Sequence, residues 1–211
     1  ELSSLVERVT AHFEDWNFAH GLQETETFFW THFTDTYLEI AKPRARWFED
    51  GATGDQAAES GSAVAALRLG FNVLLRLFAP VMPYVTEEIW SWTFAEETGE
   101  ASIHTAPWPS ASDFAGIAAP DDAGSFDLAV AALASINKGK TDNEVSLGRE
   151  IEMLHVCANA GTLARLAVVE DDVLAAARCH AHQNNEDAAL EDGVVEAREM
   201  VFAPKPEKKK K

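Results

Sequence analysis

Apolar residues recur at helical spacing through the first half of the chain. In residues 67–78 they stand three and four positions apart, which places one apolar stripe on a helix: Leu67, Phe71, Leu74, Leu75 and Phe78. Pro80 has no amide hydrogen and must end this helix, whereas Pro83 fits the first turn of another. The pattern predicts a buried hairpin of two helices, over 63–79 and 83–95.

The same spacing predicts further helices before this hairpin. The first runs from Leu2 to Asp15 or Trp16, and Asn17 is a suitable N-cap for the second. A break near Thr34-Asp35 leads into a third helix over 34–47. The buried stripe of the second helix is expected to comprise Phe18, Leu22, Phe29 and Phe33, and Trp30 and Tyr37 are also expected in the core.

Two features limit the third helix. Pro43 lies within its pattern and should kink or end it. Residues 49–62 are small and polar, which predicts a loop that leads into the long helix of the hairpin.

The pattern changes after the hairpin. Residues 96–119 show no periodicity, although the APWP stretch is expected to fix Trp108 against the helices. A helix is predicted over 121–138. Residues 150–158 alternate as in a strand, with Ile151, Met153, His155 and Cys157 on one side. One or two helices in 161–178 and weaker strands near 179–183 and 194–202 complete this half.

The predicted fold class is therefore α+β and mainly α. An antiparallel helical bundle over 1–119 is followed by a small α+β subdomain over 120–203. The tail, 204–211, is expected to be disordered because its composition is basic and polar.

Composition narrows the class of protein. A hydrophobic content of 46%, with 12 Phe and 6 Trp, indicates a folded globular chain. No apolar run is recognised as long enough to span a bilayer, so no membrane partner is expected. Two cysteines form no disulfide framework and favour a reducing, cytoplasmic setting.

The net charge of −18 opposes general nucleic-acid binding, because phosphate neutralisation supplies most of that affinity. Residues 1–119 hold 6 Lys/Arg against 18 Asp/Glu, and residues 120–211 hold 11 against 17. Any contact with RNA must come from a local basic spot on an acidic body.

Two such spots are candidates. The first combines positive charge with an indole that a base could stack on: Lys42, Arg44, Arg46 and Trp47. The alternative is that these charges only balance the neighbouring acidic residues Glu39, Glu49 and Asp50. The second spot is Lys138 and Lys140 at a helix C-terminus, where the helix dipole favours positive charge in any case.

Catalytic and metal-binding motifs are not found. The chain has no Gly-rich phosphate loop, nucleophile elbow or metalloprotease helix. His155, Cys157 and His182 include zinc-ligand types, with Cys179 and His180 nearby, but the paired CxxC or HxxxH spacing is missing. We expect no metal and no catalytic residue in this segment, and a metal-dependent enzyme is the weakest hypothesis.

Three stretches resemble the anticodon-binding domain of the valyl-tRNA synthetases, class Ia enzymes, and their actinobacterial branch most of all. In order they are FFWTHFTDTYLEIAKPRAR (28–46), LLRLFAPVMPYVTEEIWSW (74–92) and SIHTAPWP (102–109). The resemblance covers residues 1–109 well and 120–157 more loosely. Asn137 and Gly139 stand where the family has more basic or helix-favouring residues.

The resemblance implies a module that binds the anticodon stem-loop of tRNA(Val). The two ATP-site signatures of the family are absent from these residues, so ATP and Mg²⁺ are expected only in the catalytic domain. The implied partners are tRNA(Val) and the catalytic and editing domains of the same enzyme, which is expected to be monomeric. The family's bundle also begins one helix earlier, and a coiled-coil arm follows where this chain has KPEKKKK.

One alternative function remains open at this stage. An inherited helical bundle could dock a protein partner through its acidic surface without binding RNA. Titration with tRNA distinguishes the two.

Overall fold

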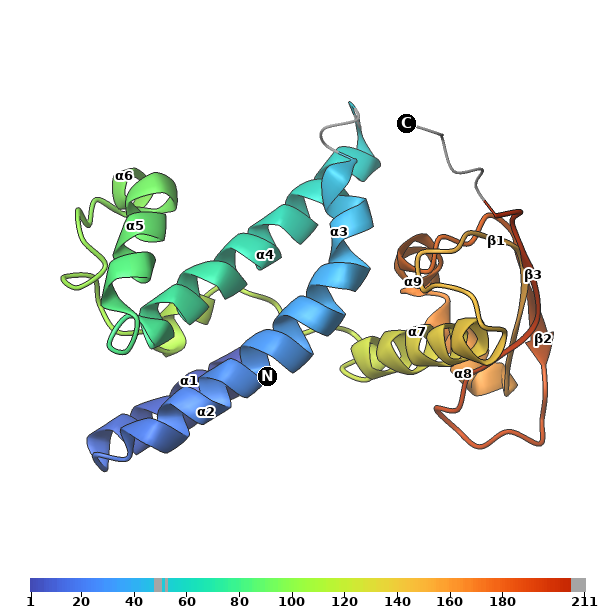
Figure 1. The fold of residues 1–211 in the computed structure, drawn as a ribbon, viewed down its shortest axis with the longest axis horizontal. Coiled ribbons are helices and arrows are strands. Elements are labelled where there is room, and N and C mark those ends of the chain that lie inside the picture. Colours follow the sequence, from blue (N-terminus) through green and yellow to red (C-terminus); the bar gives the residue numbers. More distant parts are fainter. Residues whose placement is uncertain (48–50, 52, 206–211) are drawn as a thin grey trace. The chain divides into compact units, whose positions relative to one another are not determined.

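The protein is described by a computed structural model that covers residues 1–47, 51 and 53–205 (Figure 1). The chain forms two compact units. The first comprises Glu1–Glu39 and Ala45–Ala118, and the second comprises Ile40–Arg44 and Ala119–Lys211. The sequence predicts a division at 119/120 but not the assignment of Ile40–Arg44. Most of the predicted tail, from residue 206 onward, lies outside the described residues.

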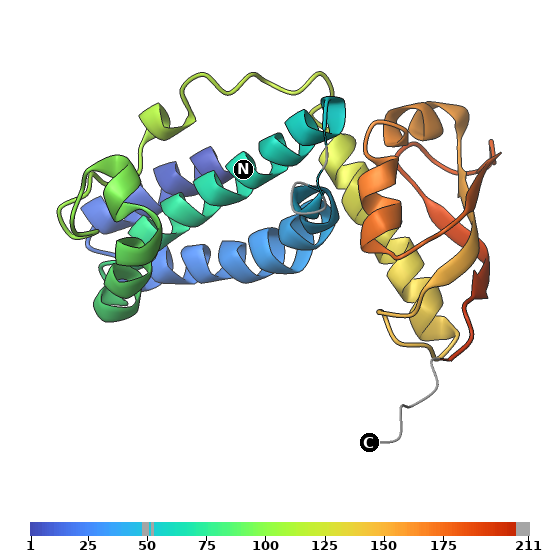
Figure 2. The same ribbon diagram turned by 90° about the horizontal axis from the view of Figure 1, so that it is seen from above.

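The first unit begins with α1 (Leu2–Glu14) and α2 (Phe18–Thr27), which pack against α4 (Figures 1 and 2). Both lie where the periodicity predicts them, and Asn17 is the N-cap of α2. The core of this unit forms where the apolar faces of α1 and α4 meet, around Leu5, Val9, Val73 and Leu77.

The predicted break at Thr34-Asp35 is wrong. The chain continues from α2 through a π-helix, η1 (Phe28–Leu38), into α3 (Glu39–Arg46), which contains Pro43 without ending there. Threonine hydroxyls support the wider turns: Thr31 donates to the Thr27 carbonyl and Thr36 to the Thr31 carbonyl, both at 2.6 Å. These bonds satisfy carbonyls in a register that a 3.6-residue pattern does not anticipate.

The long helix α4 (Asp55–Phe78) starts earlier than predicted. Residues 55–62 are helical and not a loop, and the Ser60 hydroxyl donates to the Ala45 carbonyl at 3.1 Å. Gly70 permits close packing, because a Cβ there would lie 2.4 Å from the Phe33 ring. By length and composition α4 could cross a membrane, contrary to the sequence expectation, but it supplies much of the buried core of this unit.

The hairpin prediction is confirmed. α4 ends at Phe78, and α5 (Pro83–Thr93) carries Pro83 in its first turn, followed by α6 (Ala95–Thr98). A short 3-10 helix, η2 (Ala111–Phe114), lies further along. The Trp108 indole donates to the Thr10 hydroxyl at 2.8 Å, so the APWP stretch fixes this side chain as expected.

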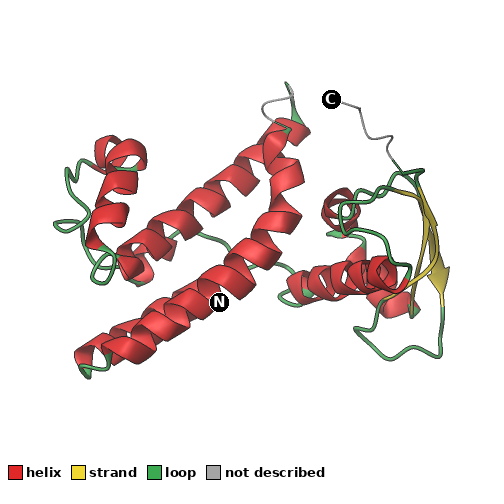
Figure 3. Cartoon of the chain, in the orientation of Figure 1, coloured by secondary structure: helices red, strands yellow, loops and turns green. Residues whose placement is uncertain are grey.

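The second unit is a three-stranded sheet with helices packed on it (Figure 3). In chain order its elements are α7 (Ser125–Asp142), β1 (Ile151–Ala158), α8 (Ala160–Leu166), α9 (Glu170–Ala176), β2 (His182–Glu186) and β3 (Glu196–Phe202). β1 is central, parallel to β2 and antiparallel to β3. The mainly α, α+β fold class is confirmed.

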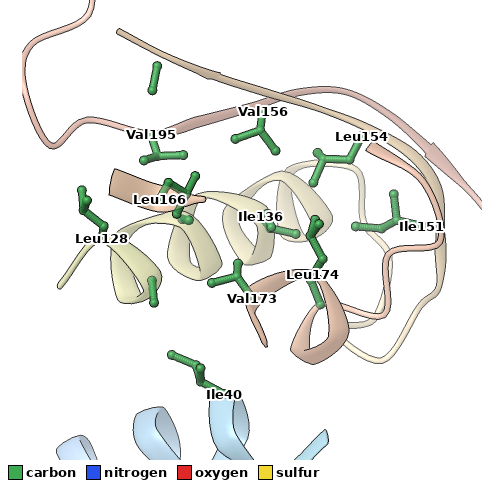
Figure 4. Packing of buried hydrophobic residues seen from close by; sticks show 14 residues of the cluster. Ile40, Leu128, Ile136, Ile151, Leu154, Val156, Leu166, Val173, Leu174 and Val195 are labelled. Carbon is green, nitrogen blue, oxygen red and sulfur yellow. The ribbon is translucent and has the colours of Figure 1, made fainter. Parts of the chain in front are cut away.

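The faces of β1 differ from the prediction. Ile151, Leu154 and Val156 point into the core, whereas Met153 is 38% exposed (Figure 4). The pairing of β1 with β3 shifts register twice between Ile151 and His155, as in a β-bulge. A bulge breaks strict alternation, so a period-two pattern assigns residues to the wrong side there.

Candidate nucleic-acid interface

The basic residues of α3 do not form one cluster. Lys42 and Arg46 are four residues apart and share one face of the helix, whereas Arg44 points to the opposite side. Arg46 is exposed and Lys42 half-buried. Trp47, directly after the helix, is also half-buried. The Lys42–Arg46 face, with Trp47 beside it, is thus the part of the first candidate spot that solvent can reach.

Arg44 has a structural role instead. Its guanidinium pairs with Asp172 of α9 at 3.1 Å, and only 29% of its side chain is exposed. Its Nε atom is buried with no hydrogen-bond partner among the described residues. The sequence suggested Glu49 and Asp50 as balancing charges, but both lie outside the described residues. Because Arg44 is committed to Asp172, its positive charge is less available to a phosphate.

The two lysines of the second candidate spot also differ in their exposure. Lys138 is exposed on α7, but Lys140 is completely buried. The Lys140 ammonium donates to the carbonyls of Leu147 and Ala177, each at 2.7 Å. Burial lowers the pKa of Lys140, and the nearby charge of Arg178 lowers it further. The structure therefore corrects the prediction that Lys140 contacts RNA. Its ammonium group links two backbone segments inside the second unit.

The small residue before Lys140 has a packing reason. A Cβ on Gly139 would lie 2.2 Å from the terminal methyl group of Met200 in β3. The side chain that the family resemblance predicts at this position would displace Met200. Gly139 thus lies at a close contact between α7 and β3, where the flexible end of Met200 would have to move to admit a larger residue.

Sequence reasoning misplaced two aromatic residues that it expected to be buried, Phe18, which is 44% exposed, and Trp30. Trp30, expected in the core, is 57% exposed on η1, with its ring edge against Phe29. Tyr37 is half-buried and stacks on Phe33 with a centroid separation of 6.3 Å. A π-helix turns more slowly than the α-helix assumed in the periodicity, which explains the wrong face for Trp30. An exposed indole can stack on an unpaired base.

The histidines and cysteines of the second unit have ordinary partners. His155 lies 3.1 Å from the Asn185 amide and 3.3 Å from Glu199, and His182 lies 3.4 Å from Glu170. Cys157 is buried, and burial raises the pKa of the Cys179 thiol. Among the described residues, no group of three or more His, Cys, Asp or Glu side chains is placed to hold a metal ion.

Comparison with known proteins gives this geometry its context. Residues 1–156 match the model of the family described as the anticodon-binding domain of tRNA ligase. The matched region contains all helices of the first unit, together with α7 and most of β1.

Similar curated proteins are valine–tRNA ligases. Those of Thermobifida fusca and Cutibacterium acnes are 36% and 37% identical over 84% and 82% of the chain. That of Haloarcula marismortui is 36% identical over 74% of it. The matched regions make up 18%, 18% and 15% of these relatives, so the chain spans less than a fifth of their length. The chain belongs to the family of anticodon-binding domains of tRNA ligases.

Proposed function

We propose that this chain is the segment of a valine–tRNA ligase that binds the anticodon stem-loop of tRNA(Val). The observation that carries the proposal is the family match over residues 1–156, which include Lys42 and Arg46 of α3. Similarity to valine–tRNA ligases supports valine as the amino acid.

Each contact residue has a distinct role in this proposal. Lys42 and Arg46 contact phosphates, and Trp47 and Trp30 offer ring faces to unpaired bases. Lys138 supplies an additional charge from α7. A small number of phosphate contacts on an acidic body gives modest affinity that falls steeply with salt.

The proposal extends to the chemistry of the whole enzyme. Valine is activated with ATP and transferred to tRNA by parts of the enzyme that this chain does not contain, and ATP and Mg²⁺ bind there. The intact enzyme is a cytoplasmic monomer in this proposal. The free thiols of Cys157 and Cys179 are consistent with a reducing compartment.

Titration with tRNA tests the proposal. The chain is titrated with tRNA(Val) transcripts that carry the native or a changed anticodon, at two salt concentrations. We expect tighter binding to the native anticodon and weaker binding at high salt. Equal, weak binding to both transcripts contradicts anticodon recognition.

A further inference from the structure

The sheet of the second unit has two edges that differ in regularity. β3 forms one edge, and its pairing with β1 shifts register twice, next to Glu199 with a φ of +50°. A bulged edge strand of this kind resists pairing with a further strand. β2 forms the other edge, where five consecutive residues pair in register with β1. Of the two edges, the β2 edge is therefore the one suited to accept another strand.

The backbone groups of β2 alternate between the sheet and the free edge. The N–H of Leu154 in β1 donates to the carbonyl of Ala181 at 3.1 Å, and the N–H of Asp187 donates to the last carbonyl of β1 at 2.9 Å. Odd-numbered residues of this strand thus bond to β1. The residues whose N–H and C=O groups point away from the sheet are His182, Asn184 and Glu186. Among the residues that the structure describes, none bonds to these outward groups.

The β2 edge is also open to solvent. Four of its five residues are exposed, and Asn185 is half-buried. The strand contains neither proline nor lysine, the residues with which natural edge strands often discourage pairing. The side chains of His182 and Asn184 contact Glu170 of α9 at 3.4 Å and 3.2 Å, so they lie on the helix side of the sheet. The outward backbone groups thus remain accessible to a strand.

The sequence of β2, HQNNE, is complementary to itself in an antiparallel pair. When two copies pair about Asn184, the histidine of each lies opposite the glutamate of the other, and Gln183 lies opposite Asn185. The same alignment sets the outward backbone groups of the two copies against each other, so that they can exchange N–H···O bonds. An imidazole opposite a carboxylate is a favourable cross-strand pair. A register shifted by two residues keeps the backbone match but loses the histidine–glutamate pairs.

We propose that two copies of this chain associate through antiparallel pairing of their β2 strands, which joins the two sheets into one. Each strand is only about 17 Å long, so the contact is smaller than the roughly 1,200 Å² of a stable interface, and the dimer is transient. The net charge of −18 on each copy also opposes it. The monomer of the proposed function is the dilute form of this equilibrium. The inference itself does not rely on tRNA binding.

Sedimentation equilibrium of the free chain tests the proposal, from about 10 μM to about 1 mM. Salt of about 0.15 M screens the repulsion between the acidic bodies. We expect the average mass to rise from 23.0 kDa towards twice that value. Asn184→Pro removes an outward N–H that the sheet itself does not use, so the fold should tolerate it. This variant should dimerise only at concentrations at least tenfold higher. Val201→Ala, at the exposed β3 edge, is the control and should leave dimerisation unchanged.

Cross-linking provides a second measurement that does not depend on the proline variant. In the proposed pair, the Cα atoms of residue 184 in the two copies lie about 5.5 Å apart, within the range of a disulfide. Asn184→Cys should therefore form a covalent dimer under mild oxidation. Val201→Cys should give at least fivefold less, and the natural chain, with Cys157 and Cys179, gives the background. Adding Glu186→Lys to Asn184→Cys should lower the yield about threefold, because a lysine then faces His182. Circular dichroism checks the fold of each variant.

Two results overturn the proposal. A chain that stays monomeric to about 1 mM, with no covalent dimer from Asn184→Cys, shows that a second copy does not bind the β2 edge and leaves the edge to a strand of another protein. Dimerisation that Asn184→Pro does not weaken, with equal cross-linking of Asn184→Cys and Val201→Cys, assigns self-association to another surface of the chain.

Discussion

The basic end of α3 and the basic end of α7 look alike in sequence but serve different purposes. Each has lysine or arginine residues two positions apart, and in each the structure places them on opposite sides of the helix. Arg46 and Lys138 face solvent, whereas Arg44 pairs with Asp172 and Lys140 is buried between two carbonyls. At each helix end, one basic residue therefore lies at the surface and another makes a structural contact.

Lys140→Ala should give the largest effect on stability. It removes two hydrogen bonds from a charged group and leaves the buried Ala177 carbonyl and the partly buried Leu147 carbonyl without this donor, so we expect a loss of about 3 kcal/mol from the second unit. Hydrogen exchange of β1 under increasing denaturant measures this loss. Lys138→Ala is the matched control and should cost less than about 0.5 kcal/mol. Equal losses of stability in the two variants would contradict a structural role for Lys140.

The Arg44–Asp172 pair should contribute less, because part of each side chain is exposed. A double-mutant cycle with Arg44→Ala and Asp172→Ala should give a coupling energy of about 1 kcal/mol. Unfolding of the single and double variants provides the values. A coupling energy near zero, together with weaker tRNA binding by Arg44→Ala, would show that Arg44 is a surface charge that contacts RNA.

Lys42→Ala and Arg46→Ala should act on RNA binding. We expect each to weaken binding of tRNA(Val) about fivefold, roughly 1 kcal/mol, and to lower the salt slope by about one. Filter binding at several salt concentrations measures both quantities. Lys140→Met, tested under conditions where it is folded, is the control and should leave the slope unchanged.

The smallest effect is the pH dependence of stability that Lys140 contributes. Because its pKa is lowered on folding, the unfolded chain binds more protons between that pKa and 10.5, and stability rises with pH in this window. The stability of the natural chain relative to Lys140→Met should therefore increase from pH 8 to pH 10. A difference that stays flat or falls would show that the ammonium is not penalised by burial.

Regular helices were predictable because their signals are local. The apolar stripe of α4 and the prolines at 80 and 83 determine the hairpin within about 20 residues of chain, and α5 begins at Pro83 as expected. Trp108 was predictable because two prolines hold its segment in an extended form beside the helices.

The errors came from features that a regular period cannot represent. The π-helix η1 turned Trp30 outward, and the bulge in β1 moved Met153 off the core side. Contacts between distant segments were also invisible: Asp172 is 128 residues from Arg44, and Ala177 is 37 residues from Lys140. The sequence identified the candidate basic residues, but only the fold showed which of them lie at the surface and which make structural contacts.

Hydrogen–deuterium exchange with an anticodon stem-loop RNA of tRNA(Val) tests the central claim most directly. The account predicts slower exchange over residues 39–47 when RNA is bound, lost at high salt and in Lys42→Ala/Arg46→Ala, with α5 unchanged. Protection of α5 instead of α3, or none at RNA concentrations that saturate binding, would contradict it.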